Sequence, residues 1–173
     1  MTKPTIIVAP DPRLKQRAMP VARVDGEIRQ LMDGMLDAMY AANGVGLAAP
    51  QVGVLKRIIV VDTSQPEEAP EPHRMVNPEI VWTSDDSIRR EEGCLSLPEH
   101  YAEVTRPERI RVRYLDAENE IRELEAGGLL ARCVQHEIDH LEGTLFVDHI
   151  SSLKRNIILR KLTKTKRMAP VPA

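Results

Sequence analysis

Gln135-His136-Glu137-Ile138-Asp139-His140 is the stretch around which we expect the rest of the chain to fold. It has the pattern H-E-x-x-H, and on a helix His136 and His140 share one face because they are four residues apart. Two imidazoles on one face can bind one metal ion, and Glu137 can then serve water as a general base. The alternative is a polar helix that matches a five-residue pattern by chance. The motif therefore favours a metal site, which needs a further ligand from elsewhere in the chain.

Glycines mark both ends of the helix predicted around this motif. Gly127-Gly128 precedes residues 129–141, and Gly143 follows them, as expected where a helix ends in a left-handed residue. Upstream, residues 109–114 alternate polar and apolar side chains, and residues 120–126 return after a polar turn. This pattern predicts a β-hairpin directly before the helix.

A second helix is predicted over residues 25–42, and Asp25 can cap its start. Its apolar side chains recur at helical spacing and are expected in the core. They are Val24, Ile28, Leu31, Met32, Met35 and Met39.

Two apolar runs predict strands, at residues 57–62 and 75–82, and Pro78 places the second at a sheet edge or a bulge. Residues 88–91 predict a short strand, which a loop at residues 92–98 is expected to interrupt. The order helix, several strands, helix, helix predicts an α+β fold, with antiparallel or mixed sheets packed around the H-E-x-x-H helix.

The C-terminal segment is basic and predicts a third helix over residues 151–166. We expect its apolar side chains to face the body, namely Leu153, Ile157, Leu162 and their neighbours. Residues 151–173 contain seven Lys or Arg and no Asp or Glu, so the total charge of −2 leaves −9 on residues 1–150. A solvated helix face and a contact with RNA phosphates both explain such a surface. We expect residues 1–150 to form a single catalytic domain, to which the basic helix and tail also belong.

The composition is typical of a soluble globular protein, with 42% hydrophobic and 29% charged residues. The apolar run Ile6-Ile7-Val8-Ala9 is too short for a secretory signal, and no run approaches the length of a membrane span, about 20 residues. We therefore expect a cytoplasmic protein whose two cysteines stay reduced and can bind a metal.

The third metal ligand has several candidates, which are Cys94, Cys133, Glu142, Asp148, His149 and His73. Cys133 shares a helical face with His136, but it lies about 10 Å along the axis from His140. We therefore interpret Cys133 as a small apolar residue beside the site. Cys94 can approach the helix from outside, and the spacing favours it modestly over His149.

A glycine-rich stretch, Gly44-Val45-Gly46-Leu47-Ala48-Ala49-Pro50-Gln51, contains the G-x-G-x-x-A pattern of dinucleotide-binding turns. Such a turn needs a strand before it and a helix after it. Here a predicted helix precedes the stretch, and Pro50 falls in the first turn of the next element. Glycines that permit a close approach of the backbone are the better interpretation.

Three segments together resemble, in order and spacing, the signature motifs of the peptide deformylase family. They are residues 44–51, Glu92-Gly93-Cys94-Leu95-Ser96-Leu97 and Gln135–His140. The similarity extends to the opening Pro10-Asp11-Pro12-Arg13-Leu14, and the C-terminal helix resembles the bacterial type I subgroup. The resemblance implies a metal-dependent hydrolase that removes the N-formyl group from the N-terminal formyl-methionine of nascent polypeptides and releases formate.

The resemblance also implies the metal ligands, which are Cys94, His136 and His140. It implies that Glu137 is the general acid/base for a metal-bound water that acts as the nucleophile. A ligand set of one cysteine and two histidines suits several divalent ions. Fe²⁺ is implied as the physiological ion, with Zn²⁺, Ni²⁺ or Co²⁺ possible in purified protein.

Further positions match residues that handle the substrate in that family. Gln51 and the backbone N–H of Leu95 are expected to face the reacting carbonyl, and Gly46 to hydrogen-bond the substrate backbone. The methionine pocket is expected to be lined by Val45, Leu129 and Cys133. Two positions vary in the family, where Arg132 replaces an aliphatic residue of some members and Tyr101 replaces an arginine of others. Selectivity beyond the methionine is left open.

The implied partners are N-formyl-methionyl nascent peptides and the ribosome, whose rRNA the basic C-terminal helix would contact. Neither a membrane nor DNA is expected as a partner. Two other functions compete with this one. A zinc endopeptidase would take its third ligand downstream of the helix, where His149 would serve. A ribosome-binding protein with a structural metal would need a fourth protein ligand.

Overall fold

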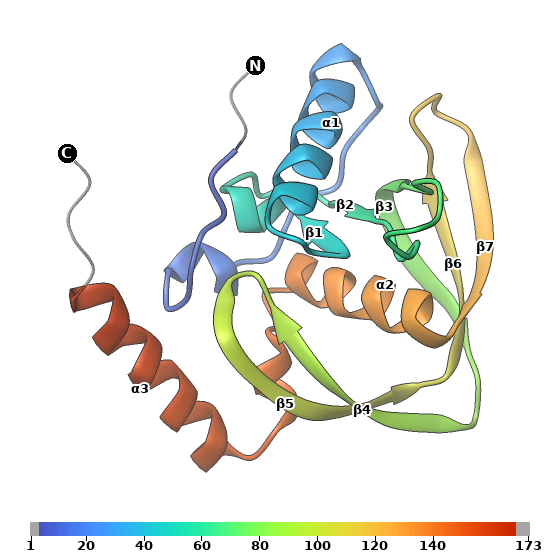
Figure 1. The fold of residues 1–173 in the computed structure, drawn as a ribbon. Coiled ribbons are helices and arrows are strands. Elements are labelled where there is room, and N and C mark those ends of the chain that lie inside the picture. The colour runs from blue at the N-terminus through green and yellow to red at the C-terminus, as the bar shows by residue number, and fades with distance from the viewer. Residues whose placement is uncertain (1–3, 169–173) are drawn as a thin grey trace.

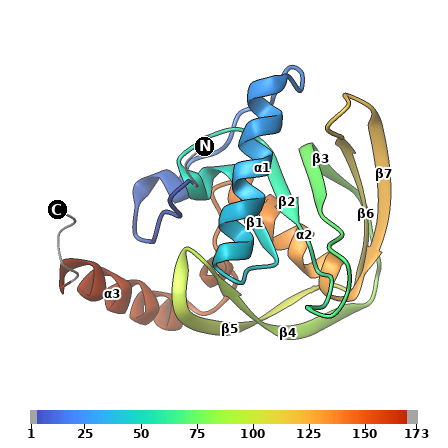
Figure 2. The same cartoon turned by 45° about the horizontal axis from the view of Figure 1, so that its top comes forward.

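The computed structural model describes residues 4–168. Helix α2 (Gly128–Leu141), which carries the H-E-x-x-H motif, crosses the centre of the molecule (Figure 1). A long hairpin, β4 (Ser87–Cys94) and β5 (Leu97–Pro107), lies on one side of α2. On the other side lie α1 (Gly26–Ala41), β1 (Gly46–Ala48) and β2 (Ile58–Val61), as Figure 2 shows from a second direction.

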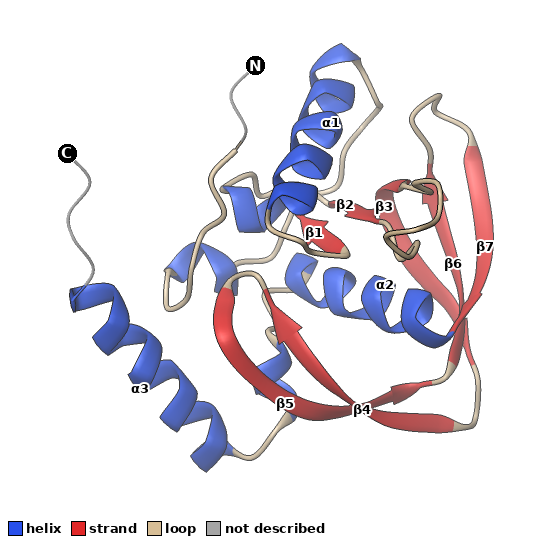
Figure 3. Cartoon of the chain, in the orientation of Figure 1, coloured by secondary structure: helices blue, strands red, loops and turns tan. Residues whose placement is uncertain are grey.

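The strands form two antiparallel sheets (Figure 3). The larger sheet has the order β1-β2-β3-β6-β7, where β3 is His73–Thr83, β6 is Arg109–Leu115 and β7 is Ile121–Gly127. The smaller sheet is the β4–β5 hairpin. The described residues also contain three 3₁₀ turns, Pro12–Lys15, Ala49–Val52 and Phe146–His149, and they end in α3 (Ser152–Met168). The α+β prediction is confirmed.

Strand β2 explains how α1 and α2 occupy opposite faces of the larger sheet. Successive side chains of a strand point to opposite faces of the sheet. All four residues of β2 are fully buried, so both faces of this strand are covered. Ile58 and Val60 pack with the α1 residues Met32, Met35 and Met39. Ile59 and Val61 belong instead to the core cluster that contains α2 residues such as Val134 and Leu141.

The predicted ends of α1 and α2 agree closely with the structure. The Asp25 side chain accepts a hydrogen bond from the Ile28 N–H at 2.9 Å, and Asn43, just beyond α1, is left-handed with φ 57°. Gly143 follows α2 with φ 75°. Pro78 lies at a bulge, because the register of β3 against β6 shifts between Val76 and Glu79. Within residues 4–168, no helix is long and apolar enough to cross a membrane.

The predicted loop at residues 92–98 is wrong. Strand β4 runs through Cys94, and β5 begins at Leu97, so only Leu95 and Ser96 form the turn. Gly93 pairs with Tyr101, and a Cβ on Gly93 would lie 2.6 Å from the Tyr101 ring. The glycine therefore allows the aromatic ring to lie against β4, and the hairpin continues where a loop was expected.

Among the named apolar residues of α3, the predicted orientation is correct only for Leu162, which is 3% exposed. Leu153 and Ile157 are 71% and 40% exposed. The inward face consists of Leu162 with the neighbouring residues Ile158 and Leu159, which pack with Leu14, Phe146 and Val147. These contacts lie in the middle of α3, and the helix extends along one side of the molecule (Figure 1). The tail residues 169–173 lie outside the described residues.

Candidate metal centre

Three predicted ligands converge at the end of β4 and on α2. Cys94, His136 and His140 each offer one ligand atom, and these atoms lie within 4.8 Å of one another. The Cys94 Sγ is 3.4 Å from His140 Nε2. One thiolate and two imidazoles are a donor set that binds a divalent metal in catalytic sites, with a further position left open. The residues present therefore fit the expected ion, and in residues 4–168 no other group of three acidic, cysteine or histidine side chains is arranged in this way.

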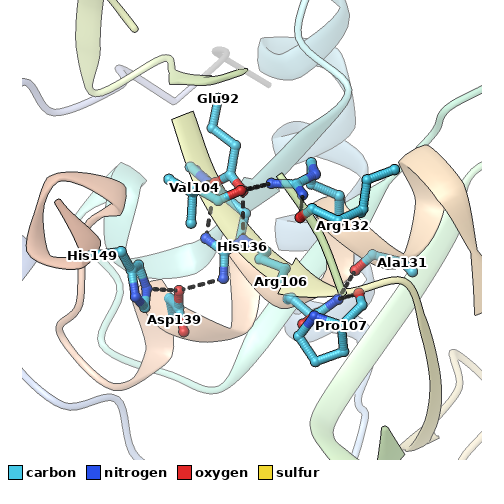
Figure 4. Close-up of polar contacts among 11 residues, drawn as sticks. Glu92, Val104, Arg106, Pro107, Ala131, Arg132, His136, Asp139 and His149 are labelled. Atoms are coloured by element: carbon cyan, nitrogen blue, oxygen red, sulfur yellow. Dashed lines mark hydrogen bonds and ion pairs between the residues drawn. The ribbon is translucent and has the colours of Figure 1, made fainter. Parts of the chain in front are cut away.

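A buried carboxylate orients the first imidazole. Glu92 Oε1 lies 3.0 Å from His136 Nδ1, so this nitrogen donates to the carboxylate and leaves Nε2 available for a metal (Figure 4). Burial acts to raise the pKa of Glu92, but hydrogen bonds from Arg106 and His136 outweigh it and bring the pKa to about 2. Burial likewise acts to lower the pKa of His136, yet the neighbouring acidic groups, Glu137 first, raise it well above its usual range.

Glu92 was not among the functional residues predicted from the sequence. One signal was available, because Glu92 and Cys94 are two residues apart and a strand turns alternate side chains to one face. Glu92 and Cys94 were both predicted to lie in a loop, where this alternation does not apply.

Two buried atoms of the site have no hydrogen-bond partner among the described residues, His140 Nδ1 and Glu137 Oε1. The Glu137 side chain is buried, and Oε1 accepts no hydrogen bond from the described residues. Burial raises the pKa of this carboxyl to about 7. The carboxylate lies against β1 so closely that a Cβ on Gly46 would be 2.6 Å from Oε2. A buried, unpartnered carboxylate beside three metal ligands is suited to proton transfer.

Gln51 is held rigidly with its amide beside the metal ligands. Its Oε1 accepts from the Ala48 N–H at 2.9 Å. Its Nε2 donates to Ser96 Oγ at 3.1 Å and lies 3.5 Å from Cys94 Sγ. The side chain can therefore offer an N–H to a group bound near Cys94 without reorganising.

A cavity of about 440 Å³ opens beside these groups. Its walls bring together the predicted substrate residues from distant parts of the chain, and they include Val45, Gly46, Gln51, Leu95, Leu129 and Cys133. Burial, with the nearby carboxylates of Glu137 and Glu92, raises the pKa of Cys133 to about 12, so its thiol stays protonated. Tyr101 and Arg132 also line the cavity.

The other candidate ligands are placed elsewhere. His149 Nε2 lies 2.8 Å from Asp139 Oδ2, which also accepts a hydrogen bond from Arg106 at 2.9 Å (Figure 4). Asp139 therefore belongs to the polar network beside the site. Glu142, at the end of α2, forms ion pairs with Arg17 and Arg57, and Asp148 forms one with Lys15. His149, the downstream histidine that an endopeptidase would use as its third ligand, is not part of the group formed by Cys94, His136 and His140.

The chain is similar to known proteins along almost its whole length. The family model described as polypeptide deformylase matches residues 3–156. A peptide deformylase of Phenylobacterium zucineum is 54% identical over 164 residues, which cover 95% of this chain and 97% of the relative. One from Mesorhizobium japonicum is 52% identical over 166 residues, 95% of this chain and 94% of the relative. The crystal structure of the Ehrlichia chaffeensis peptide deformylase with actinonin superposes with a TM-score of 0.92 and 42% identity, covering 97% of this chain and 100% of that one.

Proposed function

The chain belongs to the peptide deformylase family, and on that premise we propose how its own residues remove the formyl group from an N-formylated peptide. Enzymes of this family are metal-dependent and hydrolyse the N-formyl group of nascent peptides. The observation that carries the assignment of roles is the buried, unpartnered carboxylate of Glu137 beside Cys94, His136 and His140.

The proposed reaction is hydrolysis of a formamide. A divalent metal held by Cys94, His136 and His140 would lower the pKa of water and polarise the formyl carbonyl. Glu137 takes the proton of the attacking water and passes it to the departing amine nitrogen. The Gln51 amide and the Leu95 N–H donate hydrogen bonds to the oxygen on which negative charge develops. Removal of one such donor typically lowers the rate about 10²–10³-fold.

The substrate binds along β1, the edge strand of the larger sheet. An extended peptide can pair with the free edge of such a strand, which gives the Gly46 backbone its role. Val45, Leu129 and Cys133 then surround the methionine side chain in the cavity. The formyl group carries no substituent, so steric contact near the metal can exclude acetyl and longer groups.

A single assay tests these roles. Formate release from a formyl-methionyl peptide is measured anaerobically with Fe²⁺, together with the metal content of each variant. Glu137→Ala is expected to keep the metal and to lose turnover by about 10²–10⁴-fold, whereas Glu142→Ala, at the exposed end of α2, keeps both. Normal turnover of metal-loaded Glu137→Ala would overturn the role of this residue. Cys94→Ala is expected to lose the metal and His149→Ala to retain it.

The physiological ion is proposed to be Fe²⁺, since thiolate and imidazole ligands accept it and the family resemblance implies it. Protein reconstituted without oxygen is then expected to turn over faster with Fe²⁺ than with Zn²⁺, and to lose this advantage in air. Equal or higher turnover with Zn²⁺ would contradict the proposal.

We further propose that α3 belongs to the same domain and contacts rRNA, which also implies a cytoplasmic location. The packing of Leu162 against Leu14 and Phe146 supports a shared core. Several basic residues of α3 are exposed, including Arg160, Lys161 and Lys164. The triple alanine variant at these positions is expected to bind ribosomes more weakly at low salt and to release formate at the normal rate. Unchanged ribosome affinity would remove the basis for this contact.

A further inference from the structure

Arg132 is a buried arginine in the wall of the substrate cavity. Its side chain comes from α2 and is only 8% exposed. Nη1 donates to Glu92 Oε2 and, at 3.0 Å, to the Val104 carbonyl (Figure 4). Nη2 donates to the Ile88 carbonyl at 2.8 Å. The guanidinium therefore connects α2 to both strands of the β4–β5 hairpin.

The carboxylate that Arg132 contacts is the one that orients His136. Glu92 Oε1 accepts from His136 Nδ1 and from Arg106 Nη2 at 2.8 Å. Glu92 Oε2 accepts from Arg106 Nε at 2.5 Å and from Arg132 Nη1. Arg132 and His136 are four residues apart, so both reach Glu92 from one face of α2.

Arg106 forms a bidentate pair with Glu92, but it shares its charge with Asp139, which it contacts at 2.9 Å. Arg132 therefore adds to the charge balance of the buried carboxylate. It also has a geometric role, since it holds Oε2 from the cavity side and anchors the hairpin backbone at two carbonyls.

We propose that Arg132 is a positioning residue that fixes the metal ligand His136 through Glu92. The proposal rests on the proposed function for the identity of the metal ligands. Groups that hydrogen-bond a metal-bound histidine set its orientation, and their loss typically weakens metal binding by about 10–100-fold. Arg132 acts one step further out, and it links the wall of the substrate cavity to the metal site.

Arg132→Lys separates position from charge, because lysine keeps the positive charge but cannot reach Glu92 and two carbonyls at once. The matched control is Arg89→Lys on the same hairpin, where Arg89 is exposed and pairs with Glu103 at 2.8 Å. Each protein is loaded with Co²⁺, and we record its visible absorption spectrum and the rate at which a chelator removes the ion. We expect Arg132→Lys to shift the spectrum and to release Co²⁺ about tenfold faster, whereas Arg89→Lys matches the wild type.

A double-mutant cycle with Glu92→Gln tests the route of the effect. If Arg132 acts through Glu92, the double variant releases Co²⁺ at nearly the rate of Glu92→Gln alone. Should Arg132→Lys fail to fold, Arg132→Met, which places an unbranched, uncharged side chain in the wall, takes its place in the same measurements. A spectrum and release rate equal to the wild type, or additive effects in the cycle, would overturn the proposal. These measurements report on the metal site alone, so their outcome is distinct from that of the formate assay.

Discussion

Gly46 leaves no room for a side chain beside Glu137. A Cβ there would lie 2.6 Å from Glu137 Oε2 and 3.0 Å from Glu137 Cγ and Cδ. Both residues belong to regular elements, so the carboxylate is the group that must move. We expect Gly46→Ala to fold normally but to lose about 100-fold in kcat/KM for formate release, since a displacement of about 1 Å can cost that much.

Gly26→Ala provides the control for this prediction. Gly26 opens α1, and a Cβ at this position would have nothing within 4 Å. Its kcat/KM is expected to match the wild type. An equally active Gly46→Ala variant would mean that Glu137 does not depend on its contact with β1.

At the same scale, the sequence allowed the ligands to be proposed but not the group that orients them. His136 and His140 are recognisable because helical spacing alone puts them on one face. Glu92 is buried only because Arg106 and Arg132, 14 and 40 residues away, compensate its charge. An acidic residue in the sequence gives no sign of such partners. The contacts of Asp139 with Arg106 and His149 could not be predicted for the same reason.

At the scale of elements, the end of α2 depends on Gly143. This residue has φ 75°, and a Cβ on it would lie 2.5 Å from the Lys15 carbonyl oxygen. Gly128, at the start of α2, also has a positive φ of 58°, but a Cβ there would have nothing within 4 Å. We expect the left-handed backbone to reduce the free energy of unfolding of both alanine variants by about 1–2 kcal/mol. Gly143→Ala should lose more, because the backbone at Lys15 must also shift. Urea unfolding measures both, and equal losses would show that the contact with Lys15 relaxes freely.

Elements with strong local signals were predicted closely, and elements defined by their neighbours were not. Caps and helical spacing located α1 and α2 within about two residues. Strand β5 was missed because its exposed face carries Glu99, Tyr101, Glu103 and Thr105, and only Val104 and Leu97 are buried apolar residues. The orientation of α3 was partly wrong because the surface against which it packs is formed by residues far away in the chain.

At the scale of the whole molecule, Asp62 connects segments that the sequence separates. Its buried carboxylate accepts hydrogen bonds from Tyr40 Oη at 2.5 Å, Ser64 Oγ at 2.6 Å and the Glu71 N–H at 3.1 Å. Burial acts to raise the pKa of Asp62, but these hydrogen bonds outweigh it and lower the pKa below its usual value of 3.8. The stabilisation is therefore complete above about pH 4 and is lost as the pH falls through the lowered pKa.

We expect Asp62→Asn to reduce the free energy of unfolding at pH 7 by about 1–3 kcal/mol, because hydrogen bonds to a buried charge are lost. The difference from the wild type should shrink as the pH falls below 4. Chemical unfolding at several pH values measures this. Asp33→Asn, which removes an exposed ion pair with Arg74, is the control and should show little change. A difference that stays constant down to pH 2.5 would contradict the role of the ionised carboxylate.

The placement of Cys94 has a consequence for how the molecule holds together. The β4–β5 hairpin is a separate sheet, and Cys94 at its tip faces His140, which follows 46 residues later. An ion bound by both would cross-link the hairpin to the central helix, in addition to the hydrogen bonds that Arg106 and Arg132 make between them. Because the ion binds the folded protein, it would raise the free energy of unfolding by an amount that grows with its free concentration. Depletion of the metal would therefore weaken the attachment of the hairpin to α2 as well as remove the chemistry.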